Sequence, residues 1–444
     1  MKHFAKTLLV SVALSAATLF PAYAEMDVAG LSAAIEASIE ADYPKLDALY
    51  KDLHAHPELA FEEVKTAARL AAEMRALGFE VTEKVGITGL VAIYQNGDGP
   101  TVMVRTELDA LPMEEKTGLA YASRDKTKWK GVETFVAHSC GHDIHMASWV
   151  GTAKTLVGLK DQWRGTLMFI AQPAEEIGSG AMAMLAHGLF TRFKQPDFAF
   201  ALHDGPFPHG HIRYRVGVGS SNSDSLYVKF RGRGGHGATP QATIDPVMIA
   251  ARFIVDVQSV ISREKDPTEF GVVSIGAIHA GTAENIIPDD AQVLGTIRSF
   301  KPEVRTKMLA GIERTAKAAA AMSDAPAPEI RITAGAKAVI NDPALVGSAE
   351  KVLKAAFGDR FKTSPPGTPS EDFSEFANAG VPSMMFNIGV YDLERWNAAT
   401  NGGPPLPANH SPLFAPVPKP TIETGIKAMT LAVLSAFDQH ARGK

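Results

Sequence analysis

Short apolar runs alternate with stretches of helical periodicity through the first half of the chain and again near its end. The predicted elements are strands at 101–108, 165–172, 198–203 and 381–389 and helices at 64–78 and 145–159. Strands that alternate with helices are typical of an α/β sheet. We therefore predict an α/β domain built from residues 25–215 and 336–444.

The middle of the chain, residues 216–335, follows a different pattern. Its predicted elements are a strand at 225–232, a helix at 244–261, strands at 271–281 and 291–300, a helix at 303–322 and a strand at 329–335. This βαββαβ order is that of the ferredoxin-like split unit. We therefore predict a second domain that is inserted between the two parts of the first.

Residues 1–24 have the pattern of a secretory signal peptide. Lys2 and Lys6 precede an apolar run from Leu8 to Phe20, and the small residues AYA end at Ala24. The run is shorter than the ~20 residues that span a membrane, and no later stretch approaches that length. We expect a soluble protein without a membrane span, exported to the periplasm or secreted.

Composition and charge exclude few classes of function. The net charge of -5 is mild and the basic residues are not clustered, which argues against nucleic acid as a partner. The single cysteine, Cys140, lies within HSCGHDIHMA at 138–147. An unpaired thiol in an oxidising compartment is a liability unless it is buried or bound. From the cysteine alone, a nucleophile, a metal ligand and an inert buried group all stay open.

Side chains suited to catalysis gather where the predicted strands end. In chain order they are Glu107 and Asp109, Cys140 and His142, Glu175 and Glu176, and His203 and Asp204. Sites in open α/β sheets form at the carboxyl ends of strands, so these four segments are expected at one edge. Taken singly, each has an ordinary interpretation. Paired glutamates are common on solvated surfaces, and a lone histidine such as His145 or His410 is more often structural.

Together these residue types indicate a hydrolytic metal site. Cysteine, histidine and carboxylates bind zinc, and an oxygen-rich set suits manganese. The thiolate of Cys140 has enough lone pairs to bridge two cations. Because neighbouring side chains diverge, one member of the Glu175–Glu176 pair can bind metal. The other can take a proton from the bound water, whose pKa falls to roughly 7.

Eight ordered motifs make the chain resemble the di-metal amidohydrolases related to aminoacylases and carboxypeptidases. The nearest branch is that of hippurate hydrolase and the indole-acetyl-amino-acid hydrolases. The motifs are HSCGHDIHMA, QPAEEIGSGAMAML, ALHDGP, GRGGHGATPQATIDPV, ENIIPDD, GTIRSF, SEDFSEF and NHSPLF. They are specific for the family and not for the substrate.

The resemblance implies a metallopeptidase-type catalytic domain with two divalent metal ions, Zn or Mn, per subunit. The implied ligands are Cys140 as the bridge, His142 and His203 for one ion, and Glu176 and His410 for the other. Glu175 matches the general base that activates a metal-bridging hydroxide and later gives its proton to the leaving amine.

The resemblance also gives the inserted domain a role as a lid and as the interface of a homodimer. His236, in GGHGATP, matches a lid histidine that stabilises the oxyanion, in some members from the partner subunit. Asn285 and Arg298 match lid residues that hold the carboxylate of the substrate.

Two motifs depart from the usual form of the family. RTELDALP has Glu107 where aspartate is usual, which leaves its contact with a metal ligand open. HDIHM stands in place of HDGHT, so Ile144 and Met146 make that wall of the pocket more apolar.

The residues and the resemblance agree on a reaction, the hydrolysis of the amide bond of an N-acyl amino acid with a free carboxylate. The alternative is a metal-dependent carboxypeptidase or dipeptidase that acts on short peptides. Two further classes stay open: a hydrolase with Cys140 as its nucleophile, and an exported binding protein without activity. The sequence contains no HExxH motif, Walker loop or GxSxG elbow.

Overall fold

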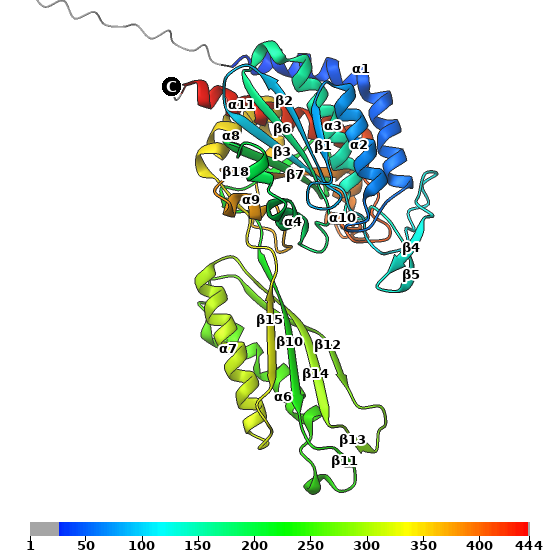
Figure 1. Cartoon of the computed structure of the whole chain (residues 1–444), viewed down its shortest axis with the longest axis vertical. Coiled ribbons are helices and arrows are strands. Elements are labelled where there is room, and N and C mark those ends of the chain that lie inside the picture. The colour runs from blue at the N-terminus through cyan, green and yellow to red at the C-terminus, as the bar shows by residue number, and fades with distance from the viewer. Residues whose placement is uncertain (1–25, 443–444) are drawn as a thin grey trace, which may run out of the picture.

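The computed structural model describes residues 26–442, which form two bodies joined at one end (Figure 1). The predicted signal peptide, 1–24, lies outside the described residues. The larger body contains an 8-stranded mixed sheet, and the smaller body contains a 4-stranded sheet. The observed fold therefore has the predicted α/β class. The middle of the chain forms a second unit, which has its own sheet and its own helices.

Parallel strands form the centre of the large sheet, whose spatial order is β1-β2-β6-β3-β7-β18-β8-β17. Strands β6, β3, β7 and β18 run parallel to one another. Strand β2 pairs antiparallel with β1 and β6, and β8 pairs antiparallel with β18. The strands are β1 (Glu80–Glu83), β2 (Leu90–Asn96), β3 (Thr101–Glu107), β6 (Gly165–Gln172), β7 (Phe198–Pro208), β8 (Ile212–Tyr214), β17 (Phe361–Thr363) and β18 (Ser383–Tyr391).

The central strands bury both of their faces. In β3, Val102 and Val104 join the apolar layer beneath α1, α3, α8 and α11, whereas Met103 packs on the other face with Met184 and Phe376. Burial on both faces explains why this strand is a continuous apolar run in the sequence. The helices of this body are α1 (Val28–Ala55), α2 (Val64–Ala76), α3 (His142–Gly158), α4 (Gly180–Ala186), α5 (Leu189–Arg192), α8 (Pro343–Phe357), α9 (Ser374–Asn378), α10 (Leu393–Thr400) and α11 (Pro418–Arg442).

The smaller body, called the inserted domain below, has the predicted βαββαβ order. Its strands pair antiparallel in the order β12-β14-β10-β15. Helices α6 and α7 cover one face of this sheet (Figure 1), where Phe230, Phe253 and Met308 are fully buried. The elements are β10 (Asn222–Arg231), α6 (Pro246–Asp256), β12 (Gly271–Ala280), β14 (Asp290–Ser299), α7 (Pro302–Ala321) and β15 (Glu329–Ala334).

Small elements complete both bodies. The short strands β11 (Gly235–His236) and β13 (Ile286–Ile287) pair at the end of the inserted domain farthest from the larger body (Figure 1). Strands β9 (Gly217–Val218) and β16 (Ile340–Asn341) pair where the chain leaves and re-enters the larger body. A hairpin of β4 (Lys126–Trp129) and β5 (Val132–Phe135) projects from the larger body.

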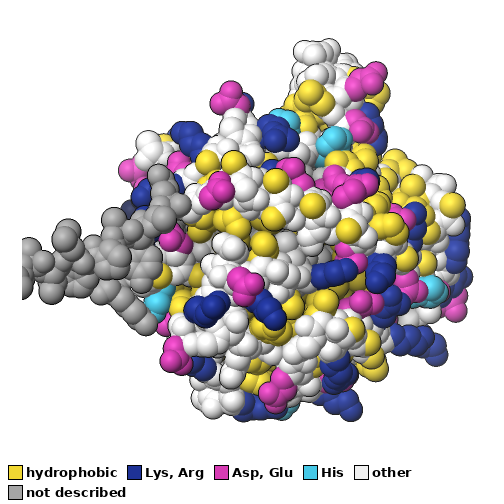
Figure 2. Space-filling view, turned by 90° about the horizontal axis from the view of Figure 1, so that it is seen from above, with side chains coloured by type: hydrophobic (Ala, Val, Ile, Leu, Met, Phe, Trp, Pro, Cys, Tyr) yellow, Lys and Arg dark blue, Asp and Glu magenta, His cyan; other side chains and the backbone are white. Residues whose placement is uncertain are grey.

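Two surface properties follow from this arrangement. Among residues 26–442, none of the helices combines the length and the apolar character that crossing a membrane requires. On the face shown in Figure 2, basic and acidic side chains are interspersed.

Candidate metal centre

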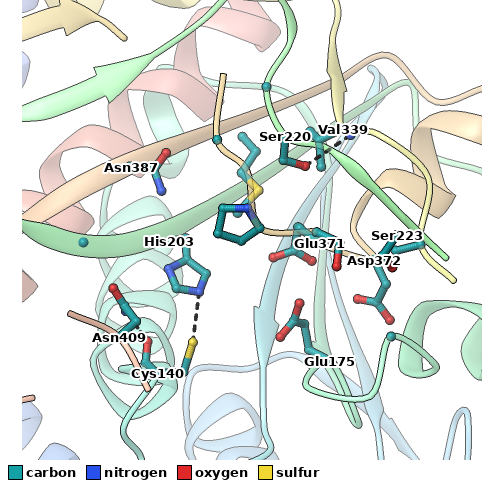
Figure 3. A pocket seen from close by; sticks show the side chains of 18 of the residues that line it. Cys140, Glu175, His203, Ser220, Ser223, Val339, Glu371, Asp372, Asn387 and Asn409 are labelled. Carbon is teal, nitrogen blue, oxygen red and sulfur yellow. Dashed lines mark hydrogen bonds between the residues drawn. The ribbon is translucent and has the colours of Figure 1, made fainter. Parts of the chain in front are cut away.

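A cavity of about 860 Å³ lies between the large sheet and the inserted domain. Glu175 and Glu176 after β6, His203 on β7, Cys140 before α3 and His410 in the C-terminal loop all line it. Arg298 on β14 of the inserted domain lines its other side. Figure 3 shows Cys140, Glu175 and His203 turned toward this shared space. The four segments are thus gathered at one edge, as the sequence predicted, but His203 and Asp204 lie within β7, which continues to Pro208 instead of ending at 203.

The turn at residues 140–142 depends on Gly141. This glycine precedes α3 with φ +85°, in the left-handed region. A Cβ at this position would lie 1.9 Å from Oδ2 of Asp204, so a side chain is excluded by contact as well as by conformation. The close approach brings Cys140 and His142 against β7 at Asp204, next to His203.

His142 is held in one tautomer by the backbone. Its Nδ1 donates to the carbonyl oxygen of Asp109 at 2.7 Å, which leaves Nε2 with a free lone pair. That Nε2 atom is buried and has no hydrogen-bond partner within the described part of the chain. An imidazole oriented through its other nitrogen is the usual arrangement of a metal-binding histidine.

Two triads of ligand atoms share the sulfur of Cys140. In each triad the atoms lie within 4.8 Å of one another; the triads are Cys140, His142 and His203, and Cys140, Glu176 and His410. The Cys140 sulfur is 3.4 Å from Nε2 of His203, and Nε2 of His410 is 3.3 Å from Oε2 of Glu176. The structure therefore brings together all five ligands named from the sequence.

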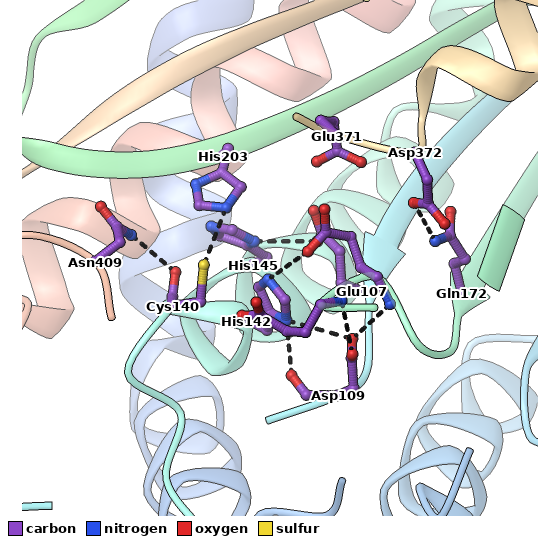
Figure 4. A network of polar contacts seen from close by, with 12 residues as sticks. Glu107, Asp109, Cys140, His142, His145, Gln172, His203, Glu371, Asp372 and Asn409 are labelled. Carbon is purple, nitrogen blue, oxygen red and sulfur yellow. Dashed lines mark hydrogen bonds and ion pairs between the residues drawn. The ribbon is translucent and has the colours of Figure 1, made fainter. Parts of the chain in front are cut away.

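The C-terminal loop is fixed to the Cys140 segment by its backbone. The N–H of His410 donates to the carbonyl oxygen of Ser139 at 2.7 Å, and His410 has φ +69°. Asn409 donates to the carbonyl oxygen of Cys140 at 2.9 Å and to Asp204 at 2.7 Å (Figure 4). A non-glycine residue in the left-handed region is strained, and such strain gathers at functional sites. Asn409 was not predicted from the sequence, although it adjoins His410 in NHSPLF.

The electrostatics of the centre fit divalent cations. Burial, reinforced by the carboxylates of Glu176 and Glu175, raises the pKa of the Cys140 thiol well above its usual value. Burial and Glu176 likewise raise the pKa of Asp109. Atom Oε1 of Glu176, like Nε2 of His142, is buried without a partner among residues 26–442. Crowded acids and free ligand atoms are both satisfied by bound cations, so the residues present fit such ions.

The same thiol is poorly suited to act as a nucleophile. A cysteine nucleophile needs a lowered pKa or an adjacent base. Here burial and acidic neighbours raise the pKa of Cys140, whose sulfur is close to His203 but also to two carboxylates. Of the roles left open for Cys140, metal ligation matches this environment.

Glu175 lies beside both triads. Its carboxylate oxygen Oε2 is 3.8 Å from Nε2 of His142, and its backbone follows Ala174, which has φ +51°. Burial and the carboxylates of Glu371 and Glu176 raise the pKa of Glu175. A raised pKa makes its carboxylate a stronger base.

A buried ion network supports the floor of the site, and the sequence did not predict it. The guanidinium of Arg105 contacts Glu107, Glu371 at 2.7 Å and Asp372 at 3.1 Å. Gln172 accepts a hydrogen bond from Arg105 and donates one to Asp372, and the contact with Asp372 is drawn in Figure 4. The motifs RTELDALP and SEDFSEF carry these residues, but neither indicates that they pair. Burial alone would raise the pKa of Glu107, but the positive charge of Arg105 outweighs burial and holds that pKa well below its usual value.

His145, interpreted from the sequence as an ordinary helix residue, joins this network to the segment that carries His203. Its Nδ1 donates to Oε2 of Glu107 at 3.0 Å, and its Nε2 accepts the backbone N–H of Asp204 at 2.8 Å. Asp204 directly follows His203. The open question about Glu107 therefore has a structural answer, because Glu107 orients His145, whose ring accepts a hydrogen bond from the backbone of β7 at Asp204.

The three predicted lid residues separate into two groups. Arg298 lines the cavity. His236 and Asn285 are exposed at the far end of the inserted domain, next to the bond from the Gly237 N–H to the Asn285 carbonyl. Ser225 of β10 lines the cavity, and from there the strand runs about 20 Å farther to Arg231, since a strand rises ~3.3 Å per residue. Within one chain the structure does not bring His236 and Asn285 to the site.

Comparisons with known proteins agree with this centre. The model of the family described as peptidase family M20/M25/M40 matches residues 103–401. Hippurate hydrolase of Campylobacter jejuni is 36% identical over 78% of this chain and 88% of its own length. IAA-amino acid hydrolase ILR1-like 2 of Arabidopsis thaliana is 31% identical over 82% of this chain and 79% of its own length. The structure also resembles the crystal structure of the YXEP protein of Bacillus subtilis, which is described as a dinuclear metal binding peptidase from the M20 family. The two superpose with a TM-score of 0.72 and 27% sequence identity, and the match covers 90% of this chain and 99% of that one.

Proposed function

The chain belongs to peptidase family M20/M25/M40, and from this premise we propose that it hydrolyses the amide bond of N-acyl amino acids with two bound divalent metal ions. Its relatives make it a metal-dependent amidohydrolase. The observation that carries the proposal is the pair of ligand triads that share the Cys140 sulfur, with Glu175 beside them.

The side chains of the metal centre would have separate roles. His142 and His203 would hold one ion, Glu176 and His410 the other, and Cys140 both. When bound, the ions supply Lewis acidity that polarises the amide carbonyl and acidifies the attacking water. Zinc and manganese both suit this mixed set of sulfur, nitrogen and oxygen ligands.

Glu175 moves the proton. It accepts a proton from the attacking water as the water oxygen bonds to the carbonyl carbon. It returns that proton to the amide nitrogen as the carbon–nitrogen bond breaks, so that a carboxylic acid and a free amine leave. Because the Glu175 carboxylate is buried near His142 and outside both Cys140 triads, it can face the substrate without being occupied as a ligand in either.

The inserted domain supplies substrate binding, and a second copy of the chain completes it. Arg298 lines the cavity and would hold the substrate carboxylate, because a guanidinium matches a carboxylate with two parallel bonds. His236 and Asn285 would reach the cavity of a partner subunit. Edge strand β12 is open to pairing, and Ile286 and Leu294 are 58% and 37% exposed on the inserted domain, which supports a homodimer through this domain.

The test combines metal analysis with a substrate panel. Purified protein should contain about two Zn or Mn ions per chain. It should hydrolyse some members of a panel of N-benzoyl, N-acetyl and indole-acetyl amino acids faster than dipeptides, and a chelator should stop the reaction. Protein that binds no divalent metal would overturn the proposal. Faster cleavage of dipeptides would make the protein a peptidase instead.

A further inference from the structure

A row of three side chains runs across the sheet from the metal centre. In the strand register, His203 on β7 lies opposite Asn387 on β18, and Asn387 lies opposite Arg213 on β8. Opposite residues on paired strands point to the same face of the sheet. Asn387 accordingly lies beside His203 in Figure 3, and all three residues line the cavity. Two strand spacings place the Arg213 backbone about 10 Å from that of His203.

The guanidinium of Arg213 is held in place without an anionic partner. Its central carbon lies 4.2 Å from the ring centre of Phe207 and 5.4 Å from that of Trp396. Among residues 26–442, no acceptor forms a hydrogen bond with this guanidinium and no carboxylate forms an ion pair with it. Burial lowers the pKa of Arg213, and no neighbouring carboxylate opposes that effect. Two aromatic rings therefore orient a partly exposed guanidinium whose N–H donors have no acceptor among the described residues.

Arg215 repeats the pattern two residues further along the same face. It lines the same cavity and donates to the carbonyl oxygen of Ser364 at 3.2 Å. Its Nε atom is buried without a partner in the described part of the chain. Elsewhere in the molecule a buried arginine is matched by acids, as Arg105 is by Glu371 and Asp372. The contrast shows that, among residues 26–442, these two arginines of the cavity wall have no acidic partner, although carboxylates line the side of the cavity at the metal centre.

We propose that Arg213, together with Arg215, forms a second anion subsite that selects substrates with a carboxylate in addition to the one assigned to Arg298. This inference rests on the proposed amidohydrolase function. An N-acyl amino acid whose carbonyl lies at the metal centre spans several ångströms on either side of the amide. The Arg213 backbone lies about 10 Å from that of His203, and the arginine side chain extends part of the way back. A second carboxylate several ångströms from the scissile amide can therefore reach the Arg213 guanidinium. The extra carboxylate belongs either to the amino-acid side chain or to the acyl group.

Matched substrates separate these two sources. One pair is N-acetylglutamate and N-acetylglutamine, and the other is N-succinylglycine and its terminal amide. The members of a pair have nearly the same shape and differ by one charge. The wild-type enzyme should prefer the acid in one pair by roughly 10- to 100-fold in kcat/KM, as expected for a hydrogen bond to a charged group. The pair that shows the preference identifies the half of the substrate that reaches Arg213.

Variants assign that preference to the arginine. Arg213→Gln should raise KM for the preferred acid by the same factor, leave kcat nearly unchanged and leave the amide substrates unaffected. Arg213→Lys should restore part of the preference, because it restores charge without the planar fork. Arg192→Gln is the matched control, since Arg192 stacks 5.5 Å from Phe193 and does not line the cavity.

The outcomes distinguish this inference from the proposed function. Equal rates for acid and amide in both pairs, or an equal loss on all substrates in Arg213→Gln, would overturn the subsite and leave the amidohydrolase intact. Should none of the substrates be hydrolysed, the proposed function fails, and calorimetric titration with glutarate decides the subsite. Metal-loaded wild-type protein should then bind glutarate roughly 10-fold or more tightly than Arg213→Gln, because the variant lacks the hydrogen bonds from a charged group. Equal binding would overturn the inference.

Discussion

Oδ1 of Asp109 accepts a hydrogen bond from the backbone N–H of Glu175 at 3.0 Å. The other oxygen of the same carboxylate accepts the N–H of Glu176 at 2.9 Å. One buried side chain therefore fixes the backbone of both the proposed base and a proposed ligand. Its own carbonyl oxygen also orients His142. Asp109 belongs to neither Cys140 triad and acts as a positioning residue.

Replacing Asp109 by alanine should damage stability and activity together. Two buried N–H groups would lose their acceptor, at about 1–3 kcal/mol for each. Loosened ligands should reduce kcat about 10- to 100-fold, the usual effect of losing an outer contact of a metal site. Urea unfolding and steady-state kinetics measure both effects. Asp109→Asn keeps one acceptor oxygen, so its unfolding free energy and its kcat should lie between those of Asp109→Ala and wild type. An alanine variant with wild-type metal content and kcat would contradict the assignment.

Glu175→Gln should abolish turnover while the protein keeps its metals. The amide has nearly the same size as the carboxylate and cannot accept a proton from water. Elemental analysis should still give about two ions per chain, because Glu175 lies outside both Cys140 triads. Cys140→Ala is the contrasting variant and should lose metal as well as activity. Appreciable turnover by Glu175→Gln would show that another group is the base.

Part of this centre could be predicted from the sequence because Glu175 and Glu176 follow strand β6 and Cys140 precedes helix α3. Strand β6 spans the predicted 165–172, and helix α3 begins at His142, three residues before its predicted start. Apolar runs place such elements, and the parallel fold then gathers whatever follows them.

The remainder depends on pairings that no local pattern encodes. Arg105 and Glu371 are 266 residues apart in the chain, and each alone is an ordinary charged residue. His145 lies on a helical repeat, and only the packing of α3 against β3 and β7 shows that it links Glu107 to Asp204. Arg213 carried no signal, because its significance lies in a partner that is absent from the chain.

Removing the metals should lower the melting temperature. Cations that bind the native state alone stabilise it by about 4 kcal/mol at a thousandfold excess over the dissociation constant. Without them, the carboxylates of Glu175 and Glu176 crowd the Cys140 thiol, whose pKa is already raised. Thermal melts with and without a chelator measure the difference, and the melt of Cys140→Ala should not respond to the chelator. An unchanged wild-type melt would count against metal binding at this site.

Stability should also depend on pH through His54. Its Nδ1 lies 2.6 Å from Asp143 and its Nε2 3.1 Å from Glu115. Burial lowers the pKa of His54, but hydrogen bonds to Asp143 and Glu115 outweigh burial and raise it to about 10. The stabilisation is complete below the unfolded pKa of about 6.5, declines above it and is lost as pH rises through the folded value.

The matching variant is His54→Gln, which removes the charge from this buried triad. Breaking such a pair costs about 3–5 kcal/mol. The gap in unfolding free energy between wild type and His54→Gln should be largest near pH 6 and should shrink toward pH 10. A gap of constant size across this range would mean that the ring is neutral in the native protein. Lys51→Gln, on the exposed side of α1, serves as a control without this pH dependence.

Two inactive variants should restore activity to each other if the partner subunit supplies His236. His236→Ala leaves the metal centre intact, and Glu175→Gln leaves the far end of the inserted domain intact. In a mixed dimer, one of the two sites then combines the Glu175 of one chain with the His236 of the other. Random exchange of equal amounts makes about half of the dimers mixed, so about 25% of wild-type activity should return. If His236 acted within its own chain, every site in the mixture would lack one of the two residues and no activity would return. The exposure of His236, with the length of β10 between it and the cavity, makes restored activity the expected result.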